Sequence, residues 1–93
     1  MSNHNNRFLK DPDETLDYSV DWSEWLAVGE TIVTSTWTAP TGITKGSDTK
    51  TTTVCTVWLS GGTAGLVYTV ANKISTTSGR IAERSLFIEV QQR

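Results

Sequence analysis

Residues 16–22 alternate strictly between apolar and polar side chains. The apolar set is Leu16, Tyr18, Val20 and Trp22, and the polar set is Asp17, Ser19 and Asp21. A period of two places successive side chains on opposite faces of a β-strand. The pattern therefore predicts a half-buried strand over residues 16–22, with its apolar side facing the core. Residues 23–26 break the alternation and predict a corner at the end of this strand.

Four later segments are rich in β-branched and aromatic residues and are also predicted to be strands. They are residues 31–38, 50–60, 66–75 and 84–91. In the first segment we expect Val33, Ser35 and Trp37 to face inward. The alternation places Tyr68, Val70 and Ile74 on one face of the third segment, and Leu86, Ile88 and Val90 on one face of the fourth. In the second segment both faces carry apolar residues. The glycine-containing segments 42–49, 61–65 and 76–81 are predicted to be turns or loops.

The spacing of these segments predicts an all-β fold. No segment shows helical periodicity over three turns, and the connections are too short for the crossover helices of a parallel sheet. Five or six strands, separated by turns at short and fairly even spacing, are typical of an antiparallel β-sandwich or a small barrel.

Length and composition agree with this prediction and add a domain boundary. The chain has 93 residues, enough for one domain, and 25 of them are serine or threonine. Threonine is stiff at χ1 and fits a pleated surface, so this composition favours strands. Residues 1–15 are mostly polar, and Pro12 favours extended backbone before it. We expect residues 1–15 to form an extended N-terminal arm and residues 16–93 to form the sandwich domain.

Charge is distributed unevenly along the chain. Residues 1–30 carry seven acidic and two basic residues, whereas residues 31–93 carry three acidic and six basic residues, which gives −5 and +3 and the net charge of −2. Such asymmetry suits either a solvated acidic lead segment or a head-to-tail contact between copies. The basic residues are too few for a groove that follows a phosphate backbone, so we expect no nucleic-acid partner.

No combination of residues predicts an enzyme. The one histidine, His4, lies in the polar lead segment, and the glycine-rich run 60–65 has no lysine and precedes a predicted strand. Asp11 and Asp13 do not belong to a calcium-loop pattern. Cys55 has no second cysteine to pair with, so it predicts a small buried side chain in a protein made in a reducing cytoplasm. We therefore expect no catalytic residue, cofactor or metal, and no membrane-spanning segment, because no apolar run approaches about 18 residues.

Four tryptophans are the strongest candidates for packing and contact roles. Trp22 and Trp37 are expected in the core. Trp58 is expected to point outward, because Val57 and Leu59 beside it would point inward, and Trp25 lies in the predicted corner. An outward tryptophan serves either a protein contact or a sugar-stacking platform.

Several stretches together resemble a family of small virion proteins of tailed bacteriophages, the fibre–tail adaptor proteins. They are Lys10–Asp13 (KDPD), Leu16–Leu26 (LDYSVDWSEWL), Thr34–Thr38 (TSTWT), Val57–Gly65 (VWLSGGTAG), Tyr68–Val70 (YTV) and Arg84–Ile88 (RSLFI). The resemblance covers roughly residues 8–91 and implies an immunoglobulin-like β-sandwich of about six or seven strands.

The same resemblance implies a structural role rather than a catalytic one. It implies several copies in the tail or neck of the virion, each attaching fibres or neighbouring tail proteins, and a protein synthesised in the host cytoplasm. We expect the contacts to involve Phe8, Leu9, Asp11, Pro12, Trp25 and Trp58. The alternative is a free-standing binding module, either a carbohydrate-binding domain or an immunoglobulin-like decoration of the head or tail.

Overall fold

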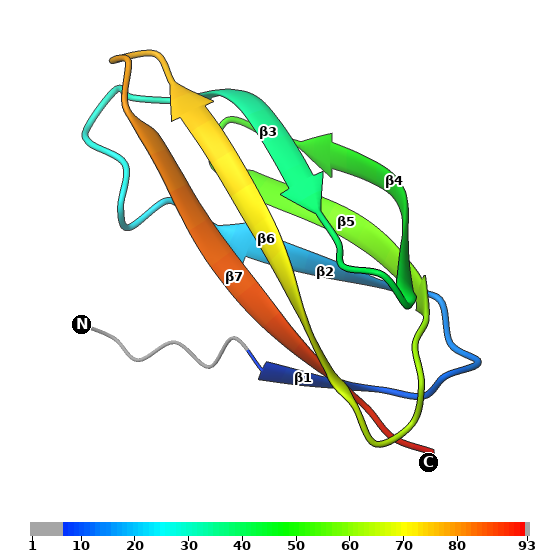
Figure 1. Cartoon of the computed structure of the whole chain (residues 1–93). Coiled ribbons are helices and arrows are strands. Elements are labelled where there is room, and N and C mark those ends of the chain that lie inside the picture. The colour runs from blue at the N-terminus through cyan, green and yellow to red at the C-terminus, as the bar shows by residue number, and fades with distance from the viewer. Residues whose placement is uncertain (1–6, 93) are drawn as a thin grey trace.

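The computed structural model describes residues 7–92, which contain seven strands and no helix (Figure 1). The strands are β1 (Arg7–Lys10), β2 (Leu16–Asp21), β3 (Ile32–Thr38), β4 (Ile43–Lys50), β5 (Val54–Gly61), β6 (Val67–Thr76) and β7 (Ile81–Val90). This confirms the all-β prediction and the number of strands that the family resemblance implies.

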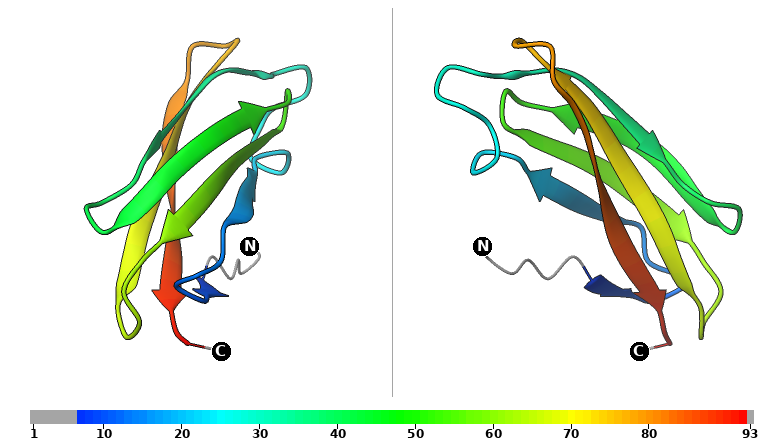
Figure 2. Two further views of the ribbon diagram at one scale, coloured as in Figure 1. Left: turned by 90° about the vertical axis from the view of Figure 1, so that its right-hand side faces the viewer. Right: turned by 60° about the vertical axis from the view of Figure 1, so that its left-hand side comes forward.

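The strands form two sheets that pack face to face, as the side view in Figure 2 shows. One sheet has the order β1-β7-β6-β3 and the other has the order β2-β5-β4. All neighbouring strands are antiparallel except β1 and β7, which are parallel. The β6–β7 hairpin and the β2–β3 loop lie at one end of the sandwich, and β1 lies toward the other (Figure 1).

The core lies between the sheets and consists of the apolar faces of the strands. Its most deeply buried members include Trp22, Cys55, Val57, Leu59, Val70, Ile74, Leu86, Ile88 and Val90. The apolar residues that the alternation grouped on one face within 18–22, 68–74 and 86–90 are all buried, and the predicted burial of Trp37 and Cys55 is confirmed. Because the two sheets pack face to face, every second residue of each strand is buried between them. This is why the period of two in the sequence predicted the strands.

Strand β3 departs from the predicted alternation at its start. Its register with β6 shifts between Ile32 and Thr34, which marks a β-bulge or irregularity. The extra residue reverses the side on which the preceding side chain lies. Ile32 is consequently buried and Val33 is 50% exposed, so the prediction that Val33 faces inward was wrong.

Strand β4 occupies residues that were predicted to form a turn. Of its eight residues only Ile43 is buried, because β4 is an edge strand with a register shift between Lys45 and Asp48. An exposed, irregular edge strand needs no apolar alternation. The pattern of residues 42–49 therefore gave no sign of a strand.

Part of the predicted N-terminal arm, residues 1–15, is paired with the sandwich. Residues 7–10 form β1 and pair with residues 87–90 of β7, while residues 1–6 lie outside the described residues. Lys10 is fully buried, and its Nζ donates to the carbonyls of Asp11 at 2.9 Å and Gly61 at 2.7 Å. Burial lowers the pKa of this ammonium group. The paired backbone and this buried side chain place β1 in the sandwich.

Candidate functional site: two exposed faces and a rigid end

Trp58 lies on the outer face of the three-stranded sheet. It is 42% exposed in the middle of β5, while its neighbours Val57 and Leu59 are fully buried, as the alternation predicted. Across β2 its register partner is Asp17, and at the β4 irregularity a Cβ on Gly46 would lie 3.6 Å from the Trp58 Cβ. A side chain at position 46 would therefore touch the base of the Trp58 side chain.

Small polar groups surround Trp58 on the same face. Ser19 of β2 and Thr56 of β5 share a hydrogen bond of 2.8 Å between their hydroxyl oxygens, and this pair lies two register positions from the Asp17–Trp58 pair. The sheet thus presents one large aromatic ring on a surface of short side chains. A ring of this kind buries much area without losing much side-chain entropy, which is typical of protein contact sites.

Trp25, like Trp58, was predicted to be a contact residue, but its environment is different. Its ring packs edge-to-face on the buried Trp22, with centroids 5.4 Å apart, and the Arg80 guanidinium lies 3.9 Å from its centroid. Trp25 is half-buried against the core. Its described contacts thus anchor the β2–β3 loop.

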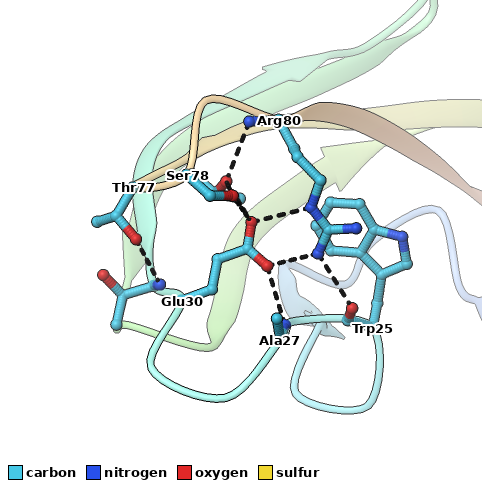
Figure 3. A network of polar contacts seen from close by, with 8 residues as sticks. Trp25, Ala27, Glu30, Thr77, Ser78 and Arg80 are labelled. Carbon is cyan, nitrogen blue, oxygen red and sulfur yellow. Dashed lines mark hydrogen bonds and ion pairs between the residues drawn. The ribbon is translucent and has the colours of Figure 1, made fainter.

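A buried carboxylate joins that loop to the β6–β7 turn (Figure 3). Glu30 accepts hydrogen bonds from the Arg80 guanidinium through both carboxylate oxygens, and its side chain is only 3% exposed. The hydroxyl groups of Thr76 and Ser78 and the backbone N–H of Ala27 also donate to it. Arg80 further donates to the Trp25 carbonyl at 3.3 Å.

These donors have an electrostatic consequence for Glu30. Hydrogen bonds from Arg80 first, then from Ser78, Thr76 and the Ala27 N–H, hold the pKa of this carboxyl far below its usual range. Glu30 in turn raises the pKa of Arg80. The arrangement is a permanent ion pair that fixes two loops, and it offers no group poised for proton transfer.

The N-terminal candidates also serve mainly internal roles. Phe8 lies edge-to-face on Tyr18 with ring centroids 5.2 Å apart. The Asp11 carboxylate accepts from the Asp13 N–H at 2.8 Å in the turn that contains Pro12. Leu9 is the exception, because its side chain is exposed. The contact roles predicted for these residues stay predictions.

A second apolar surface surrounds Leu9, on the outer face of the four-stranded sheet. Leu9 of β1, Val67 of β6 and Phe87 of β7 are 48%, 45% and 41% exposed. The registers align Leu9 with Glu89 and Glu89 with Val67, and they place Phe87 two residues before Glu89. Arg7 and Glu89 form an ion pair of 2.9 Å on this surface.

The pattern of the sequence did not indicate this second surface as a unit. The alternation of residues 84–91 placed Phe87 opposite Leu86 and Ile88, but only the strand order brings it near Leu9. Trp58 and Leu9 belong to the outer faces of different sheets, so the six predicted contact residues do not form one site.

The described residues offer little for catalysis or metal binding. Residues 7–92 contain no group of three or more histidine, cysteine, aspartate or glutamate side chains that could hold a metal ion. His4 lies outside the described residues. Burial raises the pKa of the Cys55 thiol, which disfavours its reactive thiolate. No helix long and apolar enough to cross a membrane occurs in the described part of the chain.

Comparison with known proteins identifies the family and supports the fold. A solved structure titled "Solution structure of the PKD domain from KIAA 1837 protein" is 16% identical, with a TM-score of 0.56 over 94% of this chain and 79% of that one. At this identity the likeness shows the immunoglobulin-like fold alone. No curated protein matches the chain. The family model described as "Podophage GP4 fiber-tail adaptor protein gp77" matches residues 10–89, which span the sandwich from the end of β1 to the end of β7. The chain therefore belongs to the podophage fibre–tail adaptor family.

Proposed function

We propose that this chain is a structural component of a podophage tail or neck that attaches fibres or neighbouring tail proteins to the particle. The observation that carries the proposal is the family match over residues 10–89, which includes both sheets rather than one motif. In this role the protein acts by contact and not by catalysis.

The geometry supports an adaptor because both broad faces carry exposed apolar side chains. Trp58 provides one contact point, and the surface around Leu9 and Phe87 provides another on the opposite sheet. A body with contact points on two sides can join two partners, or can bind copies of itself head to tail. We propose that several copies assemble in the particle.

The alternative of a sugar-binding module receives less support from the same face. Carbohydrate platforms of the kind considered use neighbouring aromatic rings, and the register partners of Trp58 and Thr56 across β2 are Asp17 and Ser19. Among the described residues, Trp58 has no aromatic register partner on the outer face of this sheet.

The direct test uses particles made by phage in which the gene for this chain is disrupted. We expect them to lack fibres in electron micrographs and to regain fibres when the wild-type protein is supplied. We expect Trp58→Ala to lower incorporation into particles about tenfold, because truncating a central aromatic contact commonly costs 1–3 kcal/mol or more.

Val33→Ala is the matched control, because Val33 is similarly exposed but lies away from both surfaces on β3. It should leave incorporation unchanged. Circular dichroism and thermal melting must show that both variants fold. Normal fibre occupancy on particles without the protein would contradict the proposed function, whereas equal incorporation of the two variants would remove only Trp58 from the interface.

A further inference from the structure

On three of the four edge strands a charged side chain donates a hydrogen bond to a backbone carbonyl. On β2, Arg84 donates to the Asp21 carbonyl at 3.3 Å. On β3, Lys50 donates to the Ile32 carbonyl at 3.5 Å, and on β4, Lys45 donates to the Gly46 carbonyl at 3.0 Å. Strands β3 and β4 also carry register shifts. Charged side chains and bulges are the usual means by which edge strands avoid unwanted pairing.

The β1 edge lacks these features at Leu9. In a parallel pair, alternate residues of a strand bond to its neighbour and the others direct their backbone groups the opposite way. The Lys10 carbonyl accepts a hydrogen bond from the Gln91 N–H at 2.9 Å, so the backbone groups of Lys10 point toward β7. Leu9 therefore directs its N–H and C=O away from β7, and no described residue bonds to either group.

Exposed apolar side chains lie directly beside this open backbone. The Leu9 side chain lies on the outer face with Phe87 and Val67, around the Arg7–Glu89 ion pair. A strand added along β1 would place every second side chain on the same outer face, beside Leu9. Its main chain would meanwhile meet the free groups of Leu9.

We propose that the β1 edge receives an extended segment of a neighbouring virion protein, which adds to the four-stranded sheet as a fifth strand beside β1. The segment carries apolar residues at alternate positions, so that they lie on the outer face beside Leu9 and extend the apolar surface. This inference rests on the proposed function and names the kind of partner segment that the adaptor binds.

The size of the surface favours a segment over a second copy of this chain. β1 has four residues, and the surface has three apolar side chains that are each about half exposed. A stable contact between two folded domains needs roughly 1,200 Å² or more of buried surface. An added strand needs less area, because main-chain hydrogen bonds contribute to its affinity.

The first test measures hydrogen exchange of the Leu9 amide by mass spectrometry. The full-length protein is measured free in solution. It is measured again after it has been added to particles that were made without it and has bound to them. We expect the Leu9 amide to exchange freely in the isolated protein and at least tenfold more slowly in the particle. Unchanged exchange of Leu9 in particles that have bound the protein would overturn the inference and leave the proposed function intact.

The second test separates the backbone of Leu9 from its side chain. Leu9→Pro removes the N–H that points away from β7, so the β1–β7 hydrogen bonds remain. Leu9→Ala keeps the N–H and shortens the side chain. We expect both to fold, and we expect Leu9→Pro to reduce binding to deficient particles at least tenfold, and more than Leu9→Ala does.

Two outcomes of this experiment contradict the inference. Equal binding of Leu9→Pro and wild type would show that the β1 edge stays unpaired in the particle. Concentration-dependent dimerisation of the isolated protein, measured by sedimentation and abolished by Leu9→Pro, would show that a second copy occupies the edge. Should Leu9→Pro fail to fold, the exchange of the wild-type amide decides the question.

Discussion

Trp22 and Trp37 are both buried, but only one of them uses its indole N–H. The Trp22 Nε1 donates to Asn72 Oδ1 at 2.9 Å, and Asn72 also donates to Ser35 Oγ at 3.0 Å. The Trp37 Nε1 is buried without a described partner. A buried polar group that loses its partner costs about 1–3 kcal/mol, whereas an unpaired N–H has no such bond to lose.

We therefore expect Trp22→Phe to lower the free energy of unfolding by about 1–3 kcal/mol more than Trp37→Phe does. Both substitutions remove a similar ring volume, so Trp37→Phe is the control for lost packing. Urea denaturation of the two variants measures the difference. Equal losses would show that the Trp22–Asn72 hydrogen bond adds no net stability.

The lowered pKa of Glu30 predicts how the stability of the protein depends on pH. Its pKa in the folded protein lies below the value of about 4.3 that an unfolded glutamate has, so the folded state holds the carboxylate more strongly. This contribution to stability is fully present above the unfolded pKa and is lost as pH falls below it.

Glu30→Gln should therefore be less stable than wild type at pH 7, and its stability should depend less on pH between about 5 and 2. Thermal melting across this range measures both effects. Glu83→Gln is the control, because Glu83 lies on an exposed position of β7. If the melting temperatures of wild type and Glu30→Gln changed with pH in the same way, the ion pair would not be the source of the pH dependence.

At the scale of strands, the sequence predicted best where both periodicity and burial were regular. Strands β2, β6 and β7 have one buried face each, and their boundaries agree with the predicted segments to within about three residues. Strand β4 was missed because its residues are mostly exposed. Strand β1 was missed because its stability depends on β7, which lies about 80 residues away in the sequence.

The candidate contact surfaces also differ in whether a local sequence pattern could predict them. Outward exposure of Trp58 followed from local alternation, since Val57 and Leu59 had to face inward. The surface around Leu9 depends on strand order and on a parallel pairing, which no local pattern encodes. The Glu30–Arg80 ion pair likewise joins a loop to a turn that only the folded topology brings together.

The loop between β5 and β6 depends on a close approach at Gly62. This residue has a φ of +99°, and an added Cβ would lie 2.7 Å from Val90 Cγ2. Gly79, in the β6–β7 turn, has a φ of +90° with no atom within 4 Å of that position. The two glycines therefore share the same backbone constraint but differ in available space.

We expect Gly79→Ala to cost about 1–2 kcal/mol, which is the cost of a left-handed conformation for a residue with a Cβ. Gly62→Ala should cost more, because Val90 must also move. Chemical denaturation of both variants gives the difference directly. Equal costs would show that the β5–β6 loop shifts to relieve the contact.

At the scale of the whole molecule, the sandwich is a thin plate with different chemistry on its two faces. Its principal extents are 42 × 27 × 17 Å, and the shortest is close to the depth of two packed sheets. Trp58 lies on one face and Leu9 on the other, so partners bound at these points would approach the plate from opposite sides. The plate is held at one end by the Glu30–Arg80 ion pair and near the other by Lys10.

The parallel pairing of β1 with β7 also constrains when the β1 edge can form. β1 leaves the ribosome early, but its hydrogen-bonding partner in the sheet is the last strand described. Contacts between such distant segments form late in folding, because a long loop must close first. The amine of Lys10 and the backbone of Leu9 thus reach their final positions only after β7 has been made. A chain truncated before β7 cannot form the β1–β7 pair, and it therefore lacks the edge that we propose as the docking site for a partner segment.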